Sequence, residues 1–211
     1  MTKAYKNFTD KLDELNRTIL EFDTILISDE PLPFVYNNAN FITKSFLINL
    51  CGYLETYLKD ALELALLDFK ERLTKENLSY NLIRWSIEQK PKSDSKMNSI
   101  LDKKHCRFDK LDLKIKKNDL DNFISGNPFR TKDLFEMFGI KLEENINFQD
   151  KKELINTIVT KRNNILHHND DASDLTNADI CIFITEFRDY SSGLDSEIEN
   201  IIQNKALHII A

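Results

Sequence analysis

Apolar residues recur at steps of three and four over long stretches of this chain, and this spacing constrains the fold more than any other feature. Steps of this size place the apolar side chains on one face of an α-helix. The stripe between residues 2 and 26 comprises Phe8, Leu12, Leu15, Ile19, Phe22 and Leu26. The 211 residues include only four Gly and four Pro, too few for a turn-rich β-sandwich or barrel. The predicted fold class is therefore all-α.

The helices that we expect follow from this periodicity together with turn and capping signals. They cover approximately residues 2–26, 38–73, 77–89, 97–102, 118–124, 130–138, 147–167 and 176–204. Residues 108–115 alternate between apolar and polar side chains, so a short strand remains an alternative there. We expect one domain over residues 1–211, with a basic connecting segment at about 90–117.

Several individual residues mark where these helices begin, turn or pack. Asn147 is the predicted N-cap of the helix that carries the candidate site, and Thr176 with Asp179 resembles a capping box. The stretch 125–128, Ser-Gly-Asn-Pro, is typical of a turn. Gly52 lies within a long apolar helix, and we interpret it as a point of close packing against a neighbouring element.

Charge is distributed unevenly along the chain, whose net charge is −6. Residues 90–117 contain ten Lys or Arg and four Asp, whereas residues 170–211 contain nine acidic and two basic side chains. The basic segment is either a solvated lysine-rich loop or a cradle for an RNA backbone, since phosphate neutralisation dominates such affinity. In the second interpretation Lys103, Lys104 and Arg107 bind RNA.

The remaining sequence signals predict a cytoplasmic protein without a metal or cofactor. No apolar run approaches the ~18 residues of a membrane span, and no leader-like segment opens the chain. The three cysteines, Cys51, Cys106 and Cys181, are odd in number and unpaired in spacing, which favours reduced thiols. His105 and Cys106 are adjacent, but no second ligand pair lies at the spacing of a zinc site.

The segment from residue 154 to residue 168 contains an unusual inward-facing arginine. Its apolar stripe comprises Leu154, Ile155, Ile158 and Ile165. Arg162 lies in the same stripe, four residues after Ile158 and three before Ile165. Burial of a guanidinium is costly unless it has a partner, an interface or a task. A structural ion pair is one explanation, and a functional site is the other.

His167 follows Arg162 by five residues, near the expected end of the same helix. At about 100° per residue the two side chains leave the helix about 140° apart, but the long arginine can still reach a shared phosphate. Asn163 lies four residues before His167, close enough to orient its imidazole. A helix C-terminus also favours the protonated imidazole. The alternative is a helix-terminal histidine that caps backbone carbonyls.

An arginine and a histidine are sufficient for one type of RNA cleavage. A histidine that titrates near neutrality can take the proton of the 2′-hydroxyl or donate one to the 5′-oxygen. A fixed guanidinium can stabilise the negative charge on the phosphorane oxygens. This chemistry requires no divalent metal.

The run Arg-Asn-Asn-Ile-Leu-His at residues 162–167 resembles the R-N-x-x-x-H signature of the HEPN superfamily. The flanking sequence is similar to the RiboL-PSP-HEPN-like branch: residues 46–62, which include Glu55, resemble an earlier helix, and residues 123–140 resemble the short helix before the signature. The resemblance spans about residues 41–202. It implies an HEPN-type helical bundle with a long closing C-terminal helix.

The resemblance also implies a function and roles for residues. The function is metal-independent RNA cleavage by a homodimer, often in toxin–antitoxin or antiphage systems, with a possible antitoxin or defence partner. Arg162 would bind the scissile phosphate, His167 would be the general base or acid, Asn163 would orient or contact the phosphate, and Glu55 would hold Arg162. We add His168 and Lys161 as candidate RNA-binding residues.

Two alternatives to a nuclease stay open. Some HEPN domains bind RNA, a nucleotide or a protein without cutting, and others are structural subunits of defence complexes. HEPN toxins controlled by a nucleotidyltransferase often have a tyrosine two residues after the histidine. Asn169 occupies that position here, which argues against such control.

Overall fold

The computed structural model describes residues 1–30, 32–72, 115–168 and 170–203, and in these ranges the regular structure is helical. The elements are α1 (Lys3–Leu26), α2 (Pro33–Asn37), α3 (Ala39–Arg72), η2 (Lys117–Asn122), α6 (Pro128–Met137), η3 (Leu142–Glu144), α7 (Ile146–His168) and α8 (Asn177–Gln203), of which η2 and η3 are 3₁₀ turns. The all-α prediction is confirmed, including the long closing helix. The expected helices at 77–89 and 97–102, most of the basic segment and the possible strand lie outside the described residues.

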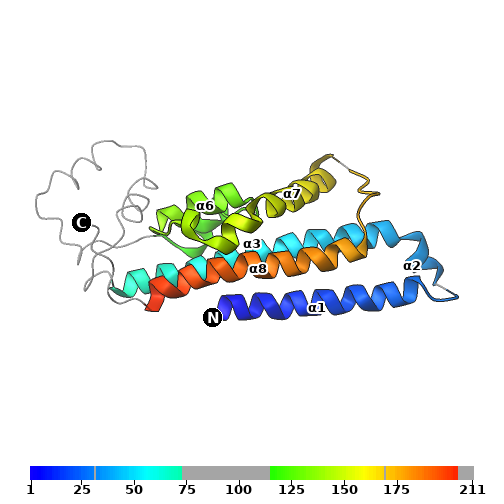
Figure 1. The fold of residues 1–211 in the computed structure, drawn as a ribbon, viewed down its shortest axis with the longest axis horizontal. Coiled ribbons are helices and arrows are strands. Elements are labelled where there is room, and N and C mark those ends of the chain that lie inside the picture. Colours follow the sequence, from blue (N-terminus) through cyan, green and yellow to red (C-terminus); the bar gives the residue numbers. More distant parts are fainter. Residues whose placement is uncertain (31, 73–114, 169, 204–211) are drawn as a thin grey trace, which may run out of the picture.

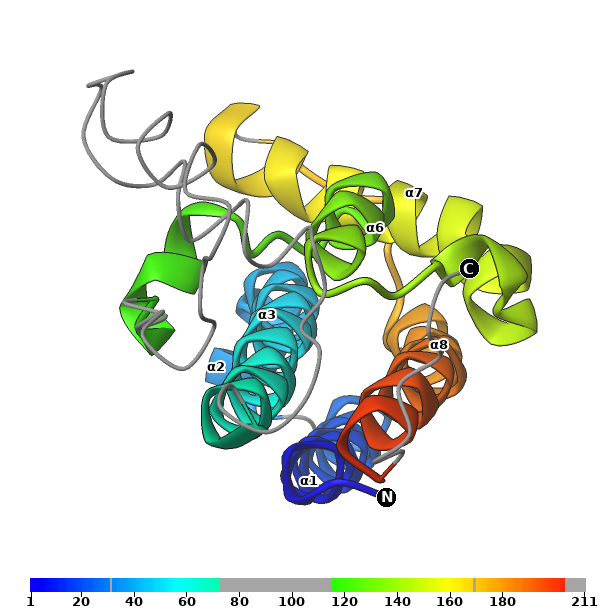
Figure 2. The same cartoon turned by 90° about the vertical axis from the view of Figure 1, so that its left-hand side faces the viewer.

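Three long helices, α1, α3 and α8, run side by side, as both ribbon views show (Figures 1 and 2). Helices α6 and α7 form a second layer on α3 and α8, on the side away from α1 (Figure 2). Side chains from both layers join in one contiguous core. Within the described ranges, no helix combines the length and the low polarity that a bilayer crossing requires.

Helix α3 is central because it is apolar on more than one face. Leu47 and Leu54 are fully buried on it, and so are Leu58 and Leu62 one and two turns further on. It packs against α1, α8 and α7, which explains why its apolar residues do not form a single narrow stripe. Gly52 differs from our expectation: a Cβ added there would meet no atom of the described residues within 4 Å, so the predicted close packing is wrong.

The N-cap of α7 is Asn145, whereas the sequence predicted Asn147. The side chain of Asn145, and not that of Asn147, accepts a hydrogen bond from the amide of Phe148 at 3.0 Å. Asn145 also donates to the carbonyl of Gly193 at 3.1 Å and to Glu197 at 2.9 Å. These bonds to α8 hold Asn145 in the capping position, so a tertiary contact selects the cap.

At two other helix starts, those of α8 and α6, the structure can be compared with the capping and turn signals in the sequence. At α8 the amide of Thr176 donates to Asp179 at 2.9 Å and the amide of Asp179 donates to Thr176 Oγ1 at 3.1 Å, which confirms the capping box. The stretch read as a turn at 125–128 already contains the start of α6. Asn127 is the N-cap and Pro128 the first helical residue, a combination that helix starts favour.

Candidate active site

Arg162 faces α3 from the last third of α7. Three residues on the same face, Ile155, Ile158 and Val159, are buried against the core. Arg162 continues this face by one further turn, and only 13% of its side chain is exposed. The inward arginine recognised in the sequence is therefore held close to its neighbours, and its contacts decide what it can bind.

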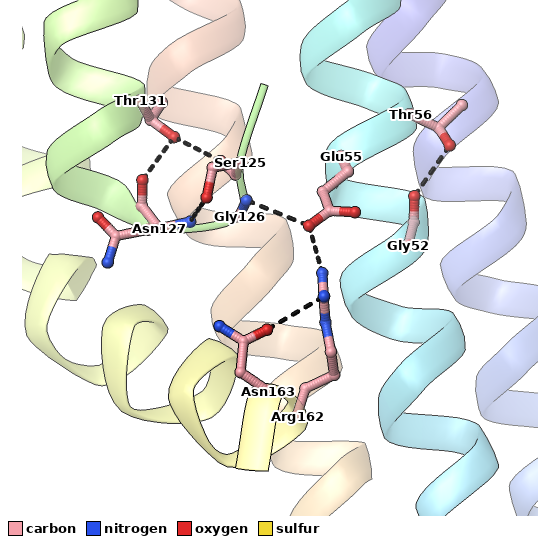
Figure 3. A network of polar contacts seen from close by, with 9 residues as sticks. All are labelled: Gly52, Glu55, Thr56, Ser125, Gly126, Asn127, Thr131, Arg162 and Asn163. Atoms are coloured by element: carbon pink, nitrogen blue, oxygen red, sulfur yellow. Dashed lines mark hydrogen bonds and ion pairs between the residues drawn. The ribbon is translucent and has the colours of Figure 1, made fainter. Parts of the chain in front are cut away.

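The guanidinium of Arg162 has two polar partners. Its Nη2 forms an ion pair with Oε1 of Glu55 on α3, and its Nη1 donates to Oδ1 of Asn163 at 3.1 Å (Figure 3). The side chain of Glu55 is 35% exposed, so the pair lies at the rim of the core. The structure thus brings together Glu55, Arg162 and Asn163 from two helices.

A loop lies against this pair. The amide of Gly126 donates to Oε1 of Glu55 at 3.4 Å, and a Cβ added to Gly126 would lie 3.1 Å from Val159 Cγ2 (Figure 3). Asn127 ties the loop to α7 through a 2.8 Å bond from its Nδ2 to Oδ1 of Asn156. Because a side chain at 126 would crowd Val159, glycine allows the backbone to approach the carboxylate.

Gly126, Asn127 and Asn156 were missed by sequence reasoning. The turn signal at 125–128 was visible, but nothing local indicated that the turn would cover the Glu55–Arg162 pair. Thr131 strengthens the loop, since its hydroxyl donates to the carbonyls of Ser125 and Asn127, each at 3.1 Å. The carboxylate is therefore supported by a loop that is itself hydrogen-bonded on both sides.

Cys51 lies beside the guanidinium on α3. Burial raises the pKa of its thiol to about 12, while the neighbouring Arg162 opposes that shift. The thiol therefore stays protonated at neutral pH and contributes a small apolar surface. Nε of Arg162 is buried, and no acceptor in the described part of the chain reaches it. The contacts of the guanidinium to Glu55 and Asn163 are made by its two outer nitrogens, Nη2 and Nη1.

His167 and His168 occupy the last turn of α7, and both are exposed. Because α7 is helical from Arg162 to His167, the two side chains leave it about 140° apart. No hydrogen bond or ion pair joins His167 to another described residue. Asn163, expected to orient this imidazole, accepts from Arg162 instead, since a charged donor is the stronger partner.

The structure describes only some of the predicted RNA-binding residues. Nζ of Lys161 forms a 2.6 Å ion pair with Asp174, and this bond lowers the pKa of the Asp174 carboxyl. Lys161 therefore does not present an unpaired charge. Lys103, Lys104 and Arg107 lie outside the described residues. Within the described ranges, no group of three or more His, Cys, Asp or Glu side chains is placed to hold a metal ion.

Comparison with known proteins identifies the family of the chain. The family model described as RiboL-PSP-HEPN matches residues 6–200, which include α3, α7 and most of α1 and α8. No curated protein and no solved structure matches the chain. Because the family model spans most of the chain and includes Glu55, Arg162 and His167, this protein belongs to the RiboL-PSP-HEPN family of the HEPN superfamily.

Proposed function

We propose that this chain is a metal-independent endoribonuclease that works as a homodimer in the cytoplasm, within a toxin–antitoxin or antiphage-defence system. Family membership supports, in general terms, a nuclease or an RNA-binding module. The burial and the fixed orientation of the Arg162 guanidinium favour a nuclease over a binding module. Its guanidinium is largely buried and oriented by Glu55 and Asn163, next to a helix end that presents His167 to solvent.

An oriented guanidinium suits a reaction in which negative charge grows on phosphate oxygens. Arg162 is held by one carboxylate oxygen and one amide oxygen, so its planar fork is fixed before a phosphate arrives. Donors that are already oriented stabilise a transition state without further reorganisation. The loop at Gly126 supports Glu55 and so contributes to this orientation.

In the proposed reaction the 2′-hydroxyl of RNA attacks the adjacent phosphorus. One histidine takes the hydroxyl proton, the bond between phosphorus and the 5′-oxygen breaks, and that oxygen receives a proton. The products are a 2′,3′-cyclic phosphate and a 5′-hydroxyl. Arg162 stabilises the charge on the two non-bridging oxygens, while His167 serves as the base or the acid.

The site that we propose is shared between two copies of the chain. Within one chain Arg162 points toward α3, and His167 leaves α7 on another side. A second copy related by a two-fold axis supplies its own His167 to the Arg162 of the first, and the reverse holds by symmetry. Asn163 and Glu55 then act as positioning residues for Arg162.

The direct test is cleavage of a fluorescent single-stranded RNA by the purified full chain in EDTA. We expect cleavage by the wild type and its loss in Arg162→Ala and in His167→Ala. Arg188→Ala is the matched control, because Arg188 pairs with Asp13 on α1, away from α7, and should keep full activity. Cleavage that EDTA abolishes, or that both variants retain, would contradict the proposal.

Mixing the two inactive variants tests the shared site. If Arg162 and His167 act across the interface, a re-associated mixture of Arg162→Ala and His167→Ala contains hybrid dimers with one intact site. Half of the dimers are hybrids with one of two sites restored, so activity returns to about a quarter of wild type. A mixture that stays inactive, with dimers present, would place both residues of a site in the same chain.

RNA binding by the wild type without any cleavage is the result that would favour the alternative, a non-catalytic HEPN module. In that case Glu55 and Arg162 form a structural or phosphate-binding pair, and His167 has no catalytic task.

A further inference from the structure

Large apolar side chains are exposed together where α1 is connected to α3. We call the five residues Ile27, Leu32, Phe34, Tyr36 and Phe41 the aromatic corner. Their exposed fractions run from 59% for Leu32 to 82% for Ile27. Single exposed apolar residues are common, but five of them within 15 residues of chain, three with aromatic rings, favour an interaction surface.

The surroundings of the aromatic corner are acidic. Residues 20–43 contain four acidic side chains and no Lys or Arg, and the same is true of residues 170–180. A 3.1 Å bond from Nδ2 of Asn40 to the carbonyl of Asp171 brings these two segments together. Asp29, Glu30 and Asp171 are exposed, whereas the nearest lysine on α3, Lys44, is half-buried.

This charge excludes two of the possible occupants on physical grounds. RNA affinity depends on Lys and Arg near the phosphates, and the segments that form this surface have none. A second copy docked symmetrically through the same face would bring Asp29 and Glu30 close to their own copies, which is unfavourable. A basic partner avoids both penalties, since its charges face opposite charges.

We infer that the aromatic corner docks a segment of another protein that is apolar on one face and rich in Lys or Arg. The aromatic rings supply apolar contact area, which is the main source of affinity in such interfaces. The exposed Asp29 and Glu30 belong to the same segment, and Asp171 is held next to it by Asn40, so their charges favour a cationic partner.

The position of this surface connects it with the candidate site. In Figure 1, α2 and the C-terminal end of α7 lie toward the same end of the molecule, and the segment between α7 and α8 meets the start of α3 through the bond from Asn40 to Asp171. A segment seated on the aromatic corner therefore binds toward the end of the molecule at which α7 ends with His167 and His168. The docking does not depend on RNA cleavage, so this inference stands apart from the proposed function.

The test uses fluorescein-labelled amphipathic peptides with the full chain. A short peptide of Leu and Lys is the probe, and a peptide of Leu and Glu with the same pattern is its control. We expect saturable binding of the Leu–Lys peptide, measured by fluorescence anisotropy at roughly physiological salt. The triple variant Phe34→Ser, Tyr36→Ser, Phe41→Ser and the double variant Asp29→Asn, Glu30→Asn should each weaken binding roughly tenfold or more.

Leu67→Ser is the matched control, because Leu67 is also exposed on α3 but lies far along the helix from the corner. It should bind the Leu–Lys peptide as the wild type does. Equal binding by the wild type and both corner variants, or strong binding of the Leu–Glu peptide, would overturn the inference. The double variant keeps the test valid if the triple variant is unstable.

Two further measurements test whether the aromatic corner binds a second copy of the chain or RNA instead. If the triple variant is monomeric in sedimentation velocity where the wild type is dimeric, the corner belongs to a second copy and the inference is wrong. It is also wrong if the triple variant loses affinity for single-stranded RNA. Neither result depends on His167→Ala, so this inference and the proposed nuclease activity fail separately.

Discussion

The partners of Arg162 determine how stable and how oriented its guanidinium is. Glu55 is its ion-pair partner, and Asn163 takes a second donor. Because the arginine is largely buried, removal of the carboxylate leaves a charge with too few partners and little access to water. Removing this carboxylate should therefore lower the free energy of unfolding more than breaking an exposed ion pair does.

The substitution Glu55→Gln tests that expectation. The amide retains the shape of the carboxylate but removes the charge, so the free energy of unfolding should fall by about 1–3 kcal/mol. Urea unfolding followed by circular dichroism measures the change. Asp13→Asn breaks the ion pair with Arg188, in which the Asp13 side chain is 70% exposed. This substitution should lower the free energy of unfolding by less than about 1 kcal/mol. Equal effects of the two variants would mean that the pair at Arg162 is no more than a surface contact.

At the scale of elements, α7 is held in place by its first turn. Asn145 binds the carbonyl of Gly193 in the middle of α8, and this contact requires the two backbones to approach closely. A Cβ added to Gly193 would lie 2.5 Å from Asn145 Oδ1 and 2.8 Å from Asn147 Cβ. The position of the Arg162 helix therefore depends on a glycine far from Arg162 in sequence.

The paired substitutions Gly193→Ala and Gly52→Ala should have opposite effects. The methyl group at 193 collides with the start of α7, and the free energy of unfolding should fall by about 1–3 kcal/mol. The methyl group at 52 meets nothing within 4 Å, and alanine restricts the unfolded chain, so stability should rise by about 0.5–1 kcal/mol. Urea unfolding of both variants checks the prediction. A stabilising Gly193→Ala would show that α7 and α8 can move apart at no cost.

At the scale of the whole molecule, several acidic groups of the core are kept protonated by burial. Burial raises the pKa of Cys51 to about 12 and also raises the pKa of Tyr57 and Tyr190. In the unfolded chain a thiol titrates near ~8.5 and a phenol near ~10. The unfolded chain then loses protons at a lower pH than the folded one, so alkaline conditions favour unfolding.

We expect the urea midpoint to fall as the pH rises from about 8.5 to 11, with the steeper part above about 10. Below about pH 8.5 these groups are protonated in both states, and their stabilising effect is fully present. Cys51→Ala should remove the early part of the decline and leave the tyrosine part. A midpoint that stays constant up to pH 11 would contradict the burial of these groups in the folded chain.

Much of the helical architecture was predictable because its signals are local. The periodicity of residues 2–26 corresponds to α1, and Thr176 with Asp179 caps α8 as expected, since side-chain spacing and capping act within a few residues. The short α2 was not predicted, although its first residue, Pro33, is of a type that helix starts favour. Arg162 was recognised as a candidate site residue because a charged side chain is unusual in the apolar stripe of a helix.

The sequence by itself determined the all-α class, the long helices, the inward position of Arg162 and the position of His167 near the end of α7, whereas the exposure of His167 and His168 came from the structure. Only the tertiary structure decided that the Gly126 amide binds Glu55, that Asn127 binds Asn156, that Asn145 caps α7, and that a Cβ added at Gly52 would meet no neighbour among the described residues. The physical reason is the range of the interactions. Helix periodicity and capping depend on near neighbours, whereas these contacts join residues that are 29 to 71 positions apart and form only when the helices have packed.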